Sequence, residues 1–154
     1  MTNPNRGFTI LEILIALAIL AMALTVTFFS FSRFNSSQAL DKSADAVISI
    51  LEEARSRTLS SVGASQYGVE LEEFEVVLFK GATYSLADPN NVITSLNTLV
   101  AIRNINLAGG GTSVVFKRLT GSTDEVGTAE IFLKASPTTF RTITISNTGV
   151  VEWN

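Results

Sequence analysis

No glycine or proline occurs between Phe8 and Val62, and this uninterrupted stretch limits what the chain can form more than any other feature. Glycine and proline are the residues least compatible with a helix interior, so their absence predicts one helix over most of the segment. At 1.5 Å per residue such a helix would be about 80 Å long. A bilayer crossing takes only about 20 residues, so the second part of the helix must serve another purpose.

The first half of the predicted helix is apolar. Ile13–Leu24 contains no polar residue, and apolar residues continue on both sides of it. With those flanks the run is long enough to cross a membrane, and Arg6 before it places the polar leader in the cytoplasm by the positive-inside rule. One carboxylate, Glu12, interrupts the run near its start. Because a carboxylate at the centre of a bilayer costs about 2.5–3.5 kcal/mol, Glu12 is expected to have a function.

The position of the small residue relative to the apolar run distinguishes this segment from an ordinary secretory signal. In such a signal the small-residue cleavage site follows the apolar core. Here Gly7 precedes it, so a cut after Gly7 would remove the leader, residues 1–7, and leave the apolar segment on the protein. Glycine suits such a site because it lets an extended backbone enter a protease cleft.

The same cut would free an amine on Phe8, four residues before Glu12. The amine and the carboxylate could pair within one chain, or between neighbouring subunits of a filament, and the pair would offset the desolvation of both charges. The alternative is a carboxylate that snorkels to the bilayer edge without a partner.

The segment Gly7-Phe8-Thr9-Ile10-Leu11-Glu12 resembles the class III signal of type IV pilins and pseudopilins, whose pattern is Gly-Phe-Thr-(Leu/Ile)-(Leu/Ile)-Glu. In that family a membrane aspartyl peptidase, the prepilin peptidase, cuts after the glycine and N-methylates the new first residue. The resemblance therefore implies cleavage between Gly7 and Phe8, N-methylation of Phe8, and a role for Glu12 in recruiting each new subunit. A plain membrane anchor is the alternative.

The second half of the predicted helix changes character after Phe31. Charged residues become frequent, and apolar residues recur at alternating spacings of four and three. This periodicity predicts one face buried against a sheet and another face in water. A coiled coil is the alternative, but the repeat covers barely two heptads, so core packing is favoured. The predicted buried stripe is Leu40, Ala44, Val47, Leu51 and Ala54.

From Gln66 onward the sequence predicts strands, because runs of Val, Leu, Ile, Thr and aromatic residues alternate with turn residues. A helix followed by antiparallel strands gives an α+β fold. We expect a leader at 1–7, a transmembrane and filament-core helix at 8–32, an amphipathic continuation at 33–62 and an antiparallel β domain at 63–154. The predicted strands, with a turn at Ser136-Pro137, are 66–71, 74–80, 99–107, 113–119, 128–134, 139–146 and 150–153.

Short segments of the helix end and the β region are similar to the GspH/FimT-type minor pilins, which include the minor pseudopilin H of type II secretion. The resemblance implies a pilin-like fold and a structural subunit that is not an enzyme and has no cofactor. Such a subunit is anchored in the inner membrane, with its C-terminal domain outside the cytoplasm. It then assembles with other pilin or pseudopilin subunits into a type II secretion pseudopilus or a type IV pilus. The segments are Glu53–Arg57, Tyr67–Val69, Val77–Gly81, Val115–Gly121 and Ile143–Val151.

Composition excludes several classes of site. The chain has no His and no Cys. Ser-His-Asp and Cys-His nucleophile systems, disulfides and the commonest zinc and copper sites are therefore excluded, and no metal site is expected. Many major pilins carry a disulfide-closed C-terminal loop, and this chain departs from that pattern. The formal net charge is −3, and removal of Arg6 with the leader makes it −3 − 1 = −4. A mildly acidic chain is not typical of general polyanion binders.

Binding of DNA during uptake in natural competence is the main alternative function. Competence members of this family bind DNA through a basic C-terminal region. The C-terminal third here has five cations and four acids, a net charge of +1, but few aromatic residues lie between the cations for stacking on bases. The cations are Arg103, Lys117, Arg118, Lys134 and Arg141.

An acidic cluster in the predicted hairpin suggests a third possibility, an anchored enzyme such as a glycan hydrolase, or a calcium site. Strand alternation places Glu70 and Glu72 on one face of the first strand, and Glu73 and Glu75 on one face of the second. A solvated sheet edge that discourages aggregation explains these residues better, because no spacing supports a catalytic pair.

Overall fold

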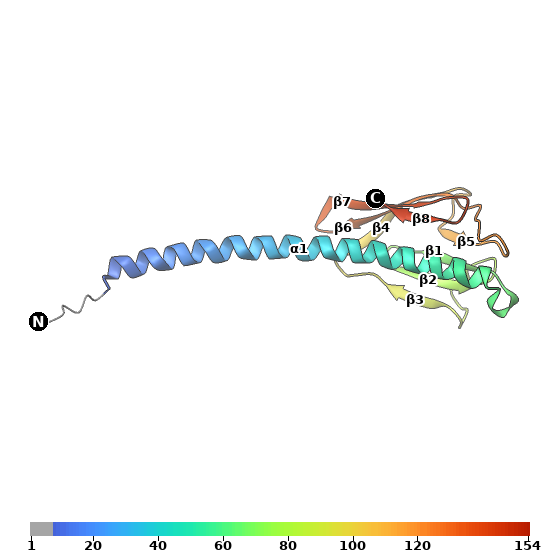
Figure 1. Cartoon of the computed structure of the whole chain (residues 1–154), viewed down its shortest axis with the longest axis horizontal. Coiled ribbons are helices and arrows are strands. Elements are labelled where there is room, and N and C mark those ends of the chain that lie inside the picture. The colour runs from blue at the N-terminus through green and yellow to red at the C-terminus, as the bar shows by residue number, and fades with distance from the viewer. Residues whose placement is uncertain (1–7) are drawn as a thin grey trace, which may run out of the picture. The chain divides into compact units, whose positions relative to one another are not determined.

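The computed structural model describes residues 8–154, apart from the side chains of residues 26 and 28–33. The expected leader at 1–7, and Gly7 with it, lies outside the described residues. By its internal contacts the chain divides into two units, Met1–Asn35 and Ser36–Asn154. One helix, α1 (Ile10–Leu59), contributes residues to both units (Figure 1).

The predicted long helix is confirmed as α1, and its two ends have clear local causes. At the start, Thr9 Oγ1 accepts a hydrogen bond from the backbone N–H of Glu12 at 3.2 Å. Thr-x-x-Glu is a capping-box sequence, in which the hydroxyl satisfies one of the free amides of the first turn. At the other end, Ser61 and Gly63 have φ angles of 49° and 58°, which a right-handed helix cannot continue through.

The second unit, all of which the structure describes, has eight strands in two antiparallel sheets. Sheet A has the strand order β3-β2-β1-β5, and sheet B has the order β4-β6-β7-β8. A single 3₁₀ turn, Val62–Ala64, links α1 to the first strand. The strands are β1 (Tyr67–Leu71), β2 (Glu75–Lys80), β3 (Val92–Ser95), β4 (Val100–Leu107), β5 (Ser113–Val115), β6 (Gly127–Leu133), β7 (Ser136–Ile145) and β8 (Val151–Trp153).

Three strand predictions were wrong: they concern β3, the start of β7 and the end of β5, and the last is described with its loop below. β3 was not predicted, because its four residues are mostly exposed and lack the alternation of a half-buried strand. The predicted turn at Ser136-Pro137 is the start of β7, and the chain reverses one step earlier, at Lys134 and Ala135. A register shift between Phe132 and Leu133 accommodates this tight connection.

The main core lies between one face of α1 and the two sheets, which both lie along the second half of the helix in Figure 1. All five residues of the predicted helical stripe are fully buried, so the periodicity is confirmed. Each buried Leu or Val stabilises the fold by about 1.5–3 kcal/mol. The sheets contribute mainly Val69, Leu71, Val76, Leu78, Val100, Ile102, Val114, Ile131, Ile143 and Ile145, and Phe116 joins them from just after β5.

Thr58 joins the end of α1 to the start of β1. Its buried Oγ1 donates a hydrogen bond to the Ala54 carbonyl at 2.8 Å and accepts one from the Tyr67 N–H at 2.9 Å. Without this hydroxyl the Tyr67 amide would lose its partner inside the fold. A buried donor left without an acceptor costs about 1–3 kcal/mol.

Thr58→Val, which keeps the shape of the side chain, is expected to lower the free energy of unfolding by about 1–3 kcal/mol. Thr58→Ser keeps the hydroxyl and removes one methyl group, so it should cost only about 0.8 kcal/mol. Urea unfolding of the full chain in detergent measures both. A valine variant at least as stable as the serine variant would contradict the assigned hydrogen bonds.

Candidate functional site

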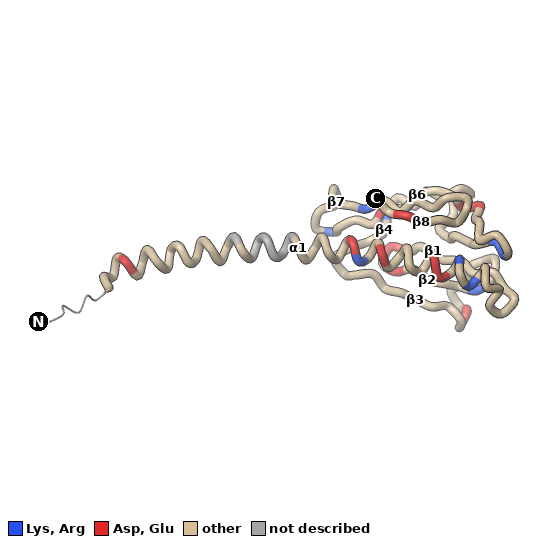
Figure 2. The backbone as a smooth tube through the Cα atoms, in the orientation of Figure 1, with Lys and Arg blue, Asp and Glu red and all other residues tan. Residues whose placement is uncertain are grey.

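The first unit presents an exposed apolar helix surface. Among the described side chains of α1 before Asn35, Glu12 is the only charged one. Figure 2 accordingly shows this part of the helix mostly in tan, with an acidic position near its start. Within the described residues, no helix has the length and hydrophobicity needed to span a membrane. The exposed large apolar side chains are Phe8, Ile10, Leu11, Ile13, Leu14, Ile15, Leu17, Ile19, Leu20, Met22 and Leu24.

Phe8 and Glu12, the predicted site residues that the structure describes, lie on the same face of this surface. They line one shallow groove, whose other walls are apolar. Phe8 lies just before the first residue of α1 and Glu12 lies in its first turn, so both are at the start of the helix. The Glu12 side chain is exposed there. The groove is completed by Ile13, Ala16, Leu17 and Leu20.

Glu12 also has a local structural position that the functional interpretation of the sequence missed. It is the third residue of α1, in the first turn, and its backbone N–H bonds to the Thr9 hydroxyl. A carboxylate in the first turn interacts favourably with the positive end of the helix dipole, by about 0.3–1 kcal/mol at an exposed site. The signal for this position, Thr9 three residues before Glu12, is present in the sequence.

The acidic residues of the β1–β2 hairpin do not form one site. Glu70 is buried, and its carboxylate accepts hydrogen bonds from the Thr112 and Ser113 hydroxyls. Its predicted place on a solvated edge is therefore wrong. Glu72 instead accepts a hydrogen bond from the Tyr84 hydroxyl at 3.2 Å. Partial burial, and then the Glu72 carboxylate, raise the pKa of Tyr84 above its ordinary value. Among the described residues, no three acidic side chains are placed to hold a metal ion.

The five cations of the C-terminal third are mostly engaged within the fold. Three of them form ion pairs, and Lys134 lies over the ring of Phe74, 5.3 Å from its centroid. In the part of the chain that the structure describes, Arg118 alone of the five is exposed and without a partner. Paired cations have less charge to offer to phosphates. The ion pairs are Arg103–Glu130 (3.0 Å), Lys117–Asp124 (2.5 Å) and Arg141–Asp41 (2.8 Å).

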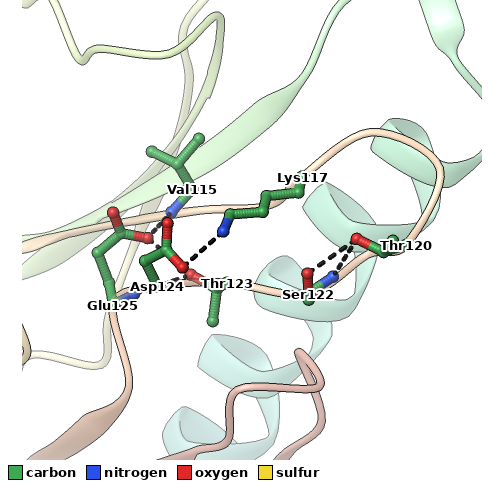
Figure 3. A network of polar contacts seen from close by, with 7 residues as sticks. All are labelled: Val115, Lys117, Thr120, Ser122, Thr123, Asp124 and Glu125. Atoms are coloured by element: carbon green, nitrogen blue, oxygen red, sulfur yellow. Dashed lines mark hydrogen bonds and ion pairs between the residues drawn. The ribbon is translucent and has the colours of Figure 1, made fainter.

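The loop between β5 and β6 is closely braced by polar contacts (Figure 3). The Glu125 carboxylate accepts a hydrogen bond from the Val115 N–H at 3.2 Å and one from the Thr123 hydroxyl at 2.6 Å. Between these contacts the chain turns at residues 118–120, so β5 ends at Val115 and does not continue to Leu119 as predicted. The other contacts are Lys117 Nζ with Asp124 Oδ1 (2.5 Å), Thr120 Oγ1 with Ser122 Oγ (2.8 Å), and the Lys117 N–H with the Ser122 carbonyl (2.8 Å).

Arg55 fastens this loop and the β7–β8 turn to the end of α1. Its Nε donates to the Gly121 carbonyl at 3.1 Å, and its Nη2 donates to the Thr148 carbonyl at 3.2 Å. Gly149 packs directly on Gly121, since a Cβ on Gly149 would lie 1.9 Å from the Gly121 oxygen. Three sequence segments that resemble minor pilins, at the helix end, the loop and the C-terminal turn, therefore meet around one arginine.

Comparisons with known proteins bear on the N-terminal segment and on the fold. Residues 2–28 match the family described as the prokaryotic N-terminal methylation motif. The structure is similar to that of the type IV minor pilin FimU of Pseudomonas aeruginosa, with a TM-score of 0.55 and 16% sequence identity. The match covers 75% of this chain and 92% of FimU. No curated protein sequence matches the chain. The likeness confirms the predicted pilin-like α+β fold, a long N-terminal helix followed by antiparallel sheets.

Proposed function

We propose that this chain, a type IV pilin-like protein by its N-terminal methylation motif and its fold, is a minor pilin or pseudopilin that assembles into a filament through α1. Proteins of this kind are structural subunits and not enzymes. In the proposal, prepilin peptidase cuts after Gly7 and methylates Phe8. Residues 8–32 hold the subunit in the inner membrane, with the C-terminal domain outside the cytoplasm, until it joins the other subunits.

The observation that carries the proposal is the exposed apolar surface of the first unit. Eleven large apolar side chains are exposed there, and removing each from water contributes about 1.5–3 kcal/mol, on the order of 20 kcal/mol together. Moving Glu12 into the same apolar setting costs about 2.5–3.5 kcal/mol. The apolar contribution is far larger, so this surface favours lipid or other apolar helices over water.

Glu12 then has a defined task in the proposal. After the cut, the new amine on Phe8 would stand at the positive end of the α1 dipole, which is unfavourable for a cation. Glu12 lines the same groove as Phe8, and in the proposal its carboxylate compensates that charge. In apolar surroundings the two groups need each other, within one subunit or across neighbouring subunits, and the pair sets the register of assembly.

The filament is either a type II secretion pseudopilus or a type IV pilus. A subunit that binds DNA for uptake would need free cations, and ion pairs occupy three of the five in the C-terminal third. The geometry therefore favours the structural role over DNA binding.

Mass spectrometry of the protein from its native membrane is expected to find Phe8 as the first residue, with one methyl group on its amine. Gly7→Val is the matched control, since a branched side chain at the cut should leave the leader attached and the amine of Phe8 unavailable. A native chain that keeps its leader, or one trimmed beyond the apolar segment, would contradict the proposal.

A further inference from the structure

β3 is a sheet edge without the protection that the other three edges have. The outward N–H of Val115 in β5 is bonded to the Glu125 carboxylate, and the outward N–H of Ile102 in β4 is bonded to the Glu73 carbonyl. β8 has only three residues, one of which is the exposed Glu152. β3 contains no charge, no proline and no register shift. Native proteins usually protect edge strands, because a bare edge accepts another strand.

The backbone groups on the outer side of β3 are free. The Leu96 N–H bonds to the Phe74 carbonyl at the end of β2, so Thr94, two residues earlier, also faces β2. Ile93 and Ser95 therefore direct their N–H and C=O groups away from the sheet. Within the described residues these groups have no hydrogen-bond partner. Ile93 is also 56% exposed, so an added strand would gain backbone bonds and cover an apolar side chain.

A hollow of about 290 Å³ lies beside this edge, between α1 and the end of β3. Three of its side chains offer donors. Ser43 is only 4% exposed, and its hydroxyl has no hydrogen-bond partner in the described residues. Lys42 is exposed and forms no ion pair in that part of the chain. The Asn97 Oδ1 already accepts the Leu99 N–H at 2.9 Å, which leaves its amide N–H groups for a ligand. The other lining residues are Ala39, Ala46, Ser95 and Leu96.

This lining is suited to a carboxylate. It combines a cation, a hydroxyl and an amide, and it contains no acid. A carboxylate has two oxygens and can accept hydrogen bonds from all three donors. A strand added to β3 would present every second side chain to α1 and the hollow, because side chains alternate between the two faces of a sheet.

We infer that β3 and this hollow bind an extended segment of a different protein, which adds a fifth strand to sheet A and places an aspartate or glutamate side chain in the hollow. Backbone bonds to Ile93 and Ser95 supply affinity, and the acid paired with Lys42 selects the segment. This binding goes beyond the proposed filament role, and assembly through α1 does not require it.

A second copy of this chain does not fit the site. The segment that carries Glu12 is helical and already uses its backbone groups, so it cannot add to a strand. The other strand edges are protected, and β3 itself has no acid for the hollow. Antiparallel pairing of two β3 strands would also reverse α1 in the second copy, since β3 lies alongside α1 (Figure 1). The two copies could then not be anchored in one membrane as proposed.

Selection of short random peptides on the full chain in detergent tests the inference. The peptides that bind are expected to share one Asp or Glu within a stretch of alternating β-branched residues. Fluorescence anisotropy of a recovered peptide should show binding at least about tenfold weaker to Lys42→Glu, and equally weaker when the amide replaces the acid. Arg118→Glu is the matched control, because it changes the same charge just after β5, at the opposite edge of sheet A. Peptides without a shared acid, or an equal loss with Arg118→Glu, would overturn the inference.

N-methylation of the recovered peptide distinguishes strand addition from binding through the side chain alone. In an added strand, alternate amides face β3 and the others face away from it. Methylation of one set should weaken binding at least about tenfold, and methylation of the other set should change it less than about twofold. The protein is unchanged in this comparison, so misfolding of a variant cannot cause the result. Similar effects of the two sets would contradict strand addition.

Thr94→Cys tests for a second copy directly. The chain has no cysteine, and two Thr94 positions would face each other in a symmetric antiparallel β3 pair. Under oxidation in detergent this variant is expected to form no disulfide-linked dimer. Such a dimer would assign the edge to a second copy and overturn the inference.

The amount of the chain in sheared filaments separates the two proposals. A chain that binds the acidic peptides but is absent from filaments contradicts only the proposed function. A chain that is present in filaments but binds no such peptide contradicts only this inference.

Discussion

Replacing Glu12 with alanine is expected to leave the protein in the membrane and to remove it from filaments sheared from cells. Loss of the carboxylate makes the apolar surface more favourable to lipid, by about 2.5–3.5 kcal/mol at the bilayer centre. It also leaves the Phe8 amine without a partner when subunits pack together. Because breaking a buried pair costs about 3–5 kcal/mol, the amount in filaments should fall at least about tenfold. Immunoblots of the membrane and of the sheared fraction measure the amount of the protein in each.

Two further variants separate the charge of Glu12 from its place in the helix cap. The capping bond uses the backbone N–H of Glu12, so it survives in Glu12→Ala. Thr9→Ala removes that bond and keeps the carboxylate, at a cost of about 0.5–2 kcal/mol to the helix start. It should still enter filaments. Glu12→Gln keeps the size of the side chain and removes its charge. It should be as depleted from sheared filaments as Glu12→Ala. Normal incorporation of Glu12→Ala would defeat the pairing idea.

The helix and its buried face could be predicted because the information for them is local. The absence of glycine and proline sets the length of α1, and the spacing of Leu40, Ala44, Val47 and Leu51 selects one face. Both depend on residues within one or two turns of each other, so they can be recognised without any knowledge of distant contacts.

The errors concern contacts between residues far apart in the sequence. Alternation within one strand places Glu70 on an outer face, but it cannot predict that Thr112 and Ser113 cover that face with hydroxyl donors. A buried carboxylate is tolerated when such donors satisfy it. Likewise β3 is defined by its pairing with β2 and by little in its own residues.

The candidate functional residues follow the same rule: what depends on neighbouring residues can be predicted, and what depends on the folded backbone cannot. Phe8 and Glu12 are four residues apart in the sequence, and the structure has both in the lining of one groove. Leu119 was predicted to end a strand, but it lies in a turn and its φ is +73°, which no pattern in the sequence indicates. A strained, exposed leucine cannot be distinguished from an ordinary strand residue until the backbone is known.

Gly149→Ala is expected to destabilise the second unit more than any other substitution considered. The residue has a φ of +77°, which costs an alanine about 1–2 kcal/mol. Its new Cβ would lie 1.9 Å from the Gly121 oxygen and 2.9 Å from Arg55 Nε. Either the loop or the turn must move, and both carbonyls that Arg55 holds would be displaced. Each hydrogen bond to a charged group contributes about 1.5–3 kcal/mol, so a total loss of at least about 4 kcal/mol is expected.

Gly110→Ala provides the matched control for this steric argument. Its φ is +74°, nearly that of Gly149, but no heavy atom lies within 4 Å of the added Cβ. It should therefore cost only the backbone strain, about 1–2 kcal/mol. Urea unfolding of both variants in detergent measures the difference. Equal losses would mean that the Gly121–Gly149 contact yields easily, and the loop between β5 and β6 would then be held by its own turn and not by Arg55.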